Sequence, residues 1–176
     1  LERSPALLAR WRETAKYSTV PVHFVHRETV PVFASDHDRF FANTEPIPVL
    51  WYTNPGMSFY HTPGDVPETV DYRVLLANTQ YIANFLVDFG NESQRFEYEG
   101  APPISAESAR DLKALFEGVG GSSLLTDEER ERLNYFISEM DKVIEADSID
   151  VLDSPEGTFF AGAYFLLFDL TYSHPG

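Results

Sequence analysis

Helical periodicity is strongest in the second half of the chain. Apolar residues recur every three or four positions from Leu75 to Phe89, and Gly90 then provides an expected helix end. Ser105 is a good N-cap for a helix that would end near Gly118. Thr126 opens the sequence Thr-Asp-Glu-Glu, which is a capping box. The helix after this box would carry one apolar stripe, at positions 133, 136, 137, 140, 143 and 144.

Two terminal segments also carry apolar patterns. Ser4 followed by Pro5 predicts a helix start, and the apolar face that follows extends the helix to about Lys16. The segment from Phe159 to Leu170 is apolar almost throughout and is interrupted by Gly162. Such a run fits either a buried helix or a buried strand, so both assignments stay open.

Three segments in the first half read as strands. Residues 20–26 and 30–33 are rich in β-branched and aromatic side chains and would be two short strands or one strand with a break. Pro21 and Pro31 would have to avoid the ladder hydrogen bonds. Residues 47–53 form a near-continuous apolar run, as expected for a strand that is covered on both faces. Strand, loop and then a long helix predict an α/β arrangement here.

These elements predict three regions along the chain. Residues 1–90 would be one region with an α/β arrangement. Residues 91–103 are polar and end in two prolines, which indicates a linker. Residues 104–176 would be a small, mainly helical extension.

Composition narrows the range of partners. An apolar fraction of 43% and an aromatic fraction of 14% are enough for a packed core. The formal charge of −15 repels phosphate backbones and disfavours nucleic-acid binding. There is no cysteine, so neither a disulfide nor a thiolate metal site is expected.

The sequence does not predict a membrane-spanning helix. The most apolar stretch, 158–172, contains Asp169 and is shorter than the roughly 20 residues that a membrane span needs.

The most informative segment extends from Ser35 to Tyr72. It contains, in order, an S-D-H-x-x-F loop at 35–40, an I-P-V-L strand at 47–50 and a Y-H-T-P-x-D loop at 60–65. This ordered set resembles the end of the catalytic domain of zinc-dependent exopeptidases of the aminopeptidase and glutamate carboxypeptidase family. The resemblance covers roughly the first 90 residues. It implies that residues 1–90 are the C-terminal portion of an α/β catalytic domain with a mixed sheet that other sequence completes. It also implies a parent enzyme that hydrolyses terminal peptide bonds with two zinc ions.

The resemblance also implies roles for single residues. His61 would be a ligand to one of the two zinc ions, for which a neutral imidazole is well suited. Tyr60 would polarise the substrate carbonyl and donate to the developing oxyanion.

Four further residues would support this site. Thr62 and Asp65 would fix the loop through local side-chain to backbone bonds. Asp36 and His37 would lie behind the ligands or at the floor of the pocket.

The chain lacks the rest of the family's active site. The family needs a histidine with a bridging aspartate, a glutamate ligand beside a general-base glutamate, and a further acidic ligand, all upstream of the S-D-H loop. Residues 1–34 contain neither an H-x-D sequence nor a Glu-Glu pair, and Glu128-Glu129 belongs to a capping box. One imidazole cannot hold two zinc ions, so the chain alone is expected to be inactive. Its partners would be a peptide substrate and the missing N-terminal part of the catalytic domain.

Two other interpretations stay open. The chain could be a non-catalytic interaction module derived from the peptidase fold, or part of a glutaminyl-cyclase-like zinc transferase that uses the same loops. By analogy with larger members of the family, residues 104–176 are a candidate homodimer interface. The family resemblance favours a secreted or periplasmic location, although the chain shows no targeting segment.

Overall fold

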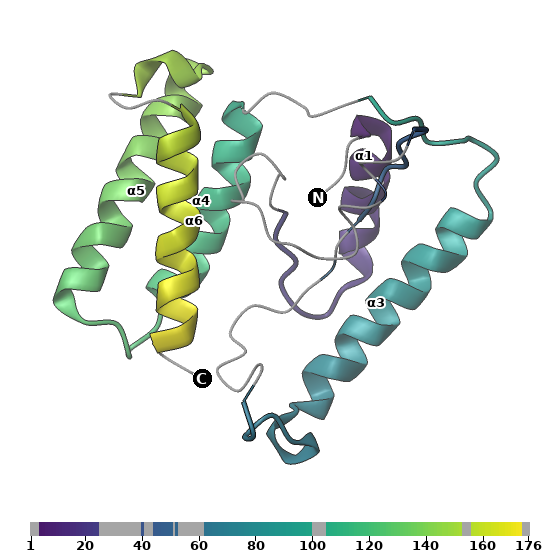
Figure 1. Cartoon of the computed structure of the whole chain (residues 1–176), viewed down its shortest axis with the longest axis horizontal. Helices are drawn as coiled ribbons and strands as arrows, with labels where there is room; N and C mark the ends of the chain where they lie inside the picture. The colour runs from purple at the N-terminus through teal and green to yellow at the C-terminus, as the bar shows by residue number, and fades with distance from the viewer. Residues whose placement is uncertain are drawn as a thin grey trace.

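The structure is a computed structural model that describes residues 4–24, 40, 44–50, 52, 62–99, 105–152 and 156–173. The longer elements in these ranges are α-helices, which Figure 1 labels: α1 (Pro5–Thr14), α3 (Tyr72–Gly90), α4 (Ala106–Gly120), α5 (Asp127–Ala146) and α6 (Glu156–Ser173). Short 3-10 turns accompany them: η1 (Ala15–Tyr17), η3 (Pro67–Thr69) and η4 (Ile149–Val151).

The expected α/β fold with a mixed sheet is wrong for the described residues, which contain helices and no strand. The backbone of residues 21–24 and 46–50 is irregular. Apolar side chains from these stretches pack against the cluster formed by α1 and α3: Val22, Phe24 and Leu50, together with Tyr52. Their apolar pattern therefore reflects burial against helices, because a strand also needs a neighbouring strand to satisfy its backbone groups. The strand expected at 30–33 lies outside the described residues.

Helices α1 and α3 are held together by an aromatic cluster. Trp11 of α1 lies between Tyr81 and Phe85 of α3, with ring centroids 5.4 Å and 4.2 Å away. The Tyr81 hydroxyl donates to the Trp11 carbonyl oxygen at 3.3 Å, and the Tyr81 side chain is fully buried. Edge-on aromatic pairs of this kind add to the stabilisation from burial alone. This cluster fixes the position of α3.

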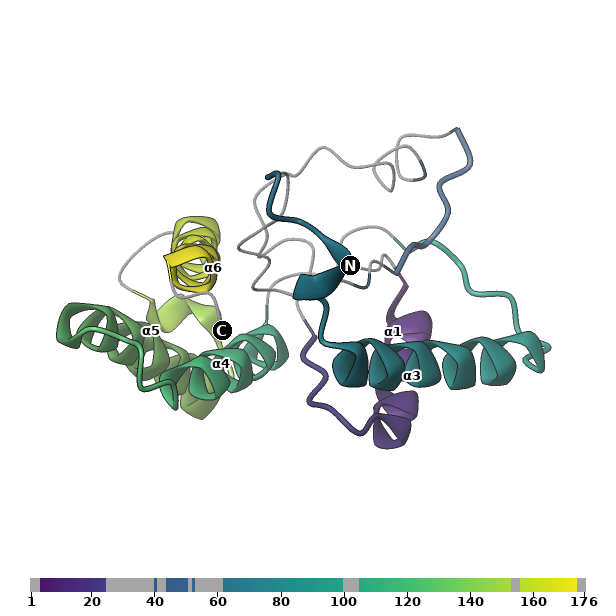
Figure 2. The ribbon, with the colours of Figure 1, turned by 90° about the horizontal axis from the view of Figure 1, so that it is seen from below.

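A second, larger core lies between α4, α5 and α6, which Figure 2 shows grouped on the opposite side of the molecule from α1 and α3. The described members of this core come from residues 106–170, and Phe116, Met140 and Phe160 are fully buried. The capping box at Thr126 is confirmed, because Thr126 N–H donates to the Glu129 carboxylate at 2.7 Å and Glu129 N–H donates to Thr126 Oγ1 at 3.3 Å.

The open assignment of the last apolar run is resolved as helix α6. Its buried residues follow helical spacing rather than alternation, at positions 159, 160, 163, 166, 167 and 170. None of the helices in the described ranges, α6 included, has the length and apolar character that crossing a bilayer requires.

Arg12 connects the two cores. Its guanidinium donates to both carboxylate oxygens of Asp111 on α4, at 2.9 Å for Nη1 to Oδ1, and lies 3.4 Å from a Glu107 oxygen. The same guanidinium stacks over the Phe24 ring at 4.7 Å. Nearby, His23 faces Gly118 of α4, and burial lowers the pKa of its imidazole, partly offset by the Asp111 carboxylate.

Replacing Arg12 with methionine is expected to destabilise the protein by about 1–3 kcal/mol, because the bidentate hydrogen bond to the Asp111 carboxylate is lost at a partly buried position. Urea unfolding followed by circular dichroism measures this change. A double-mutant cycle with Asp111→Asn should show that the two losses are not additive. Arg95→Met, at an exposed ion pair with Glu97, is the matched control and should leave the midpoint unchanged.

Candidate metal-binding loop

A tight turn follows the expected ligand His61. Thr62 organises this turn twice: its hydroxyl oxygen accepts from Gly64 N–H at 3.2 Å, and its carbonyl oxygen accepts from Asp65 N–H at 3.1 Å. Val66 N–H then donates to the Gly64 carbonyl at 3.0 Å. A threonine hydroxyl that bonds a backbone N–H two residues on is a common way to fix such a turn. The Thr62 and Asp65 side chains lie at the surface.

The turn continues into η3 and is anchored to the start of α3. Thr69 Oγ1 donates to the Val66 carbonyl at 2.7 Å, and the Tyr72 hydroxyl donates to the Pro67 carbonyl at 3.2 Å. Asp71 is the N-cap of α3, where its carboxylate accepts from Arg73 N–H at 2.9 Å and from Val74 N–H at 3.3 Å. The Arg73 side chain, followed by these backbone donors, lowers the pKa of the Asp71 carboxyl group.

Four of the six expected site residues lie outside the described residues. These are the catalytic candidate Tyr60, the metal ligand His61, and the supporting residues Asp36 and His37. The structure therefore places only Thr62 and Asp65, and their roles in a metal site stay predictions.

The described residues do not by themselves fit a zinc ion. Among them, no three histidine, aspartate or glutamate side chains gather as a metal site would need. A zinc site takes three or four protein ligands at short distance.

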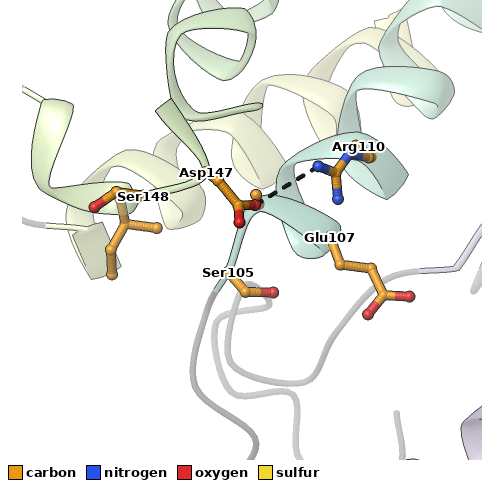
Figure 3. Close-up of a pocket in the computed structure, with 7 residues that line it drawn as sticks. Ser105, Glu107, Arg110, Asp147 and Ser148 are labelled. Atoms are coloured by element: carbon orange, nitrogen blue, oxygen red, sulfur yellow. Dashed lines mark ion pairs between the residues drawn. The ribbon is translucent and has the colours of Figure 1, made fainter. Parts of the chain in front are cut away.

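A cavity of about 400 Å³ opens elsewhere, between the start of α4 and the end of α5. Figure 3 shows Arg110 and Asp147 pointing toward each other there, with their charged groups 3.7 Å apart. Asp147 has a left-handed backbone, with φ of 49°, which turns the chain out of α5. Both charged side chains are exposed, so their ion pair contributes little. The cavity is lined by residues from two segments, 105–110 and 147–149, and the sequence pattern does not indicate that these segments lie close together.

This cavity has the wrong chemistry for a hydrolytic site. Its polar groups are serine hydroxyls at helix ends, one guanidinium and two exposed carboxylates, without a histidine or a nucleophile paired to a base. Ser148 bonds locally, since its hydroxyl accepts from Asp150 N–H at 3.2 Å. The turn at 62–71 therefore remains the candidate site.

Comparisons of the chain with protein-family models, with curated proteins and with solved structures find no match.

Proposed function

We propose that this chain is the C-terminal part of a zinc-dependent exopeptidase, an aminopeptidase, that hydrolyses terminal peptide bonds. The observation that carries the proposal is the ordered motif set, with S-D-H-x-x-F at 35–40, I-P-V-L at 47–50 and Y-H-T-P-x-D at 60–65. Each motif alone is short, so the proposal rests on their order and spacing taken together.

The geometry next to the Y-H-T-P-x-D loop supports a positioning role. The hydrogen bonds of Thr62 and the Asp71 cap tie the residues directly after His61 to a helix of 19 residues. That helix is fixed in turn by the buried Tyr81 and Phe85. A ligand directly next to such an anchored segment loses less conformational freedom on binding its metal ion.

Two residues of this chain would take part in the reaction directly. His61 would bind one zinc ion through a ring nitrogen, and Tyr60 would donate its phenol hydrogen to the substrate carbonyl oxygen as charge develops there. Asp36 and His37 would support the pocket from behind. The zinc ions would supply a polarised water and stabilise negative charge.

In this proposal the remaining ligands and the general base would come from a different polypeptide segment. Residues 1–34 have neither of the two sequence signatures that would supply them, and the described residues hold no metal-binding group. The peptide substrate would bind where the two segments meet. The isolated chain is therefore expected to be inactive.

Peptidase activity of the complete gene product that contains this chain tests the proposal. We expect release of N-terminal residues from aminoacyl p-nitroanilides, loss of this activity with 1,10-phenanthroline, and recovery when zinc is added back. Peptides ending in glutamate and peptides beginning with glutamine belong in the same panel. Cyclisation of N-terminal glutamine with release of ammonia would instead identify a glutaminyl cyclase. A zinc-free product without activity on any substrate would mean a non-catalytic module.

A further inference from the structure

Helix α3 presents a regular row of residues to solvent on the side opposite the buried Tyr81. Members of this row are alternately four and three positions apart, the spacing that keeps residues on one side of a helix that pairs with another helix. All six are exposed, Leu76 by 57% and Leu86 by 58%. In Figure 1, α3 lies along the edge of the molecule, apart from α4–α6. The row is called here the α3 seam and consists of Tyr72, Leu76, Thr79, Ala83, Leu86 and Gly90.

The α3 seam can be covered without loss of a hydrogen bond. Its two hydroxyl groups already donate within the chain: Thr79 Oγ1 donates to the Leu75 carbonyl at 2.8 Å, and the Tyr72 hydroxyl donates to the Pro67 carbonyl at 3.2 Å. Burial of a hydroxyl is costly mainly when it has no partner, so this cost is avoided. The amide side chains of α3 lie away from the seam, at Asn78, Gln80 and Asn84.

The two halves of the α3 seam mirror each other about Tyr81. At equal distances on either side of this position, Thr79 corresponds to Ala83, Leu76 to Leu86, and Tyr72 to Gly90. In an antiparallel pair of α3 helices with a two-fold axis level with position 81, corresponding residues of the two copies lie opposite each other. A second copy of α3 therefore matches the seam along its whole length.

The sizes of the residues that would meet are complementary. The centre has the small residues Thr79 and Ala83, which allow two helix axes to approach to about 8 Å. Farther out, Leu76 would contact the partner's Leu86. At each end, the Tyr72 ring would lie against the partner's Gly90, where a Cβ atom would have nothing within 4 Å.

We propose that the α3 seam binds the α3 seam of a second copy of this chain, as an antiparallel helix pair. The inference does not depend on the proposed function. The pair would bring Arg73, whose side chain is 93% exposed, to the last turn of the partner's α3, which has no basic residue of its own. A cation at a helix C-terminus interacts favourably with the helix dipole.

The charge of the chain limits the strength of this dimer without preventing it. Each copy carries a formal charge of −15, but no charged residue occurs between positions 74 and 87. Repulsion between the more distant charges is screened beyond about 8 Å at physiological ionic strength. A helix of 19 residues is about 28 Å long, so the contact is smaller than a standard interface and we expect a reversible dimer.

Sedimentation velocity of the chain at increasing concentration tests the association. We expect a monomer–dimer equilibrium that added NaCl shifts toward the dimer, because salt screens the like charges. Leu76→Glu should weaken the dimer by more than about 100-fold, since it places a carboxylate from each copy in an apolar contact. It should leave the melting temperature of the monomer unchanged, because Leu76 is exposed there.

Phe165→Glu is the matched control, because Phe165 on α6 is 55% exposed and lies outside the seam. It should change neither the dimer nor the melting temperature. A chain that stays monomeric at every concentration would overturn the inference. A dimer that survives Leu76→Glu but is lost in Phe165→Glu would also overturn it, and would place the interface in residues 104–176.

Cysteine cross-linking tests the antiparallel register, since the chain has no cysteine of its own. Leu76→Cys and Leu86→Cys chains should form a disulfide with each other when they are mixed, and neither should cross-link with itself. In the proposed pair the two copies of position 76 lie about 15 Å apart along the helix axis, too far for a disulfide. Leu124→Cys, at another exposed leucine, should cross-link with neither. Self-cross-linking of Leu76→Cys would indicate a parallel pair, and either this result or a mixture without cross-links would overturn the proposed arrangement.

Discussion

Replacing Phe116 with alanine is expected to destabilise the α4–α6 core by about 3–5 kcal/mol, the usual loss for a fully buried phenylalanine. Phe116 has no exposed surface, and its ring lies 6.0 Å from that of Phe136 on α5. Truncation removes these contacts and leaves a cavity that the three helices can close only in part. Urea unfolding followed by circular dichroism at 222 nm measures the change in the free energy of unfolding.

Leu124→Ala is the matched control for this experiment. Leu124 lies just beyond the same helix but is 53% exposed, so its truncation should change the free energy by no more than about 0.5 kcal/mol. If the two variants unfolded at the same urea concentration, the α4–α6 core described above would be contradicted.

The second large effect is expected at His61 in the complete gene product. His61→Ala should remove at least one zinc ion and reduce peptidase activity by more than about 100-fold. Residues that only orient metal ligands already cost about 10–100-fold when they are replaced, and a direct ligand should cost more. Zinc is measured by elemental mass spectrometry after dialysis, and activity with the best substrate of the peptide panel.

His174→Ala controls for the loss of an imidazole as such, since His174 belongs to none of the motifs. It should keep both zinc and activity, and circular dichroism should show both variants folded. Full zinc occupancy in His61→Ala would contradict the ligand role of His61.

The elements that the sequence predicted correctly depend on neighbouring residues. Thr126 and Glu129 are three positions apart, and their capping box needs nothing from the rest of the chain. The same holds for Gly90 at the end of α3. For α6, the buried residues from Phe159 to Leu170 follow helical spacing. The segment is apolar on almost every side, so this spacing could not be recognised in the sequence.

The elements that were predicted wrongly depend on distant residues. The runs at 20–24 and 47–50 have the composition of strands, yet strand formation requires a pairing partner, and the described residues provide none. In the structure these apolar side chains instead pack against the buried cluster that contains Trp11 and Tyr81. The pairing of Arg12 with Asp111, 99 positions apart, likewise leaves no local pattern in the sequence.

The candidate site also has a part that depends on neighbouring residues and a part that depends on distant ones. The turn at Thr62 and the cap at Asp71 are local, and both follow from residue type and spacing. The proposed zinc centre around His61 would not be local, because the motifs of this chain do not contain its other ligands. The roles of Tyr60, Asp36 and His37 stay predictions that the mutants of the complete product can test.

Zinc content, measured in parallel on the isolated chain and on the complete gene product, tests the central claim most directly. We predict near-zero zinc in the dialysed chain, because one histidine ligand does not retain the ion, and two zinc ions in the complete product. Tightly bound zinc in the isolated chain would contradict the incomplete site, since His61 would then have partners within this sequence. A complete product without zinc would contradict the exopeptidase assignment itself.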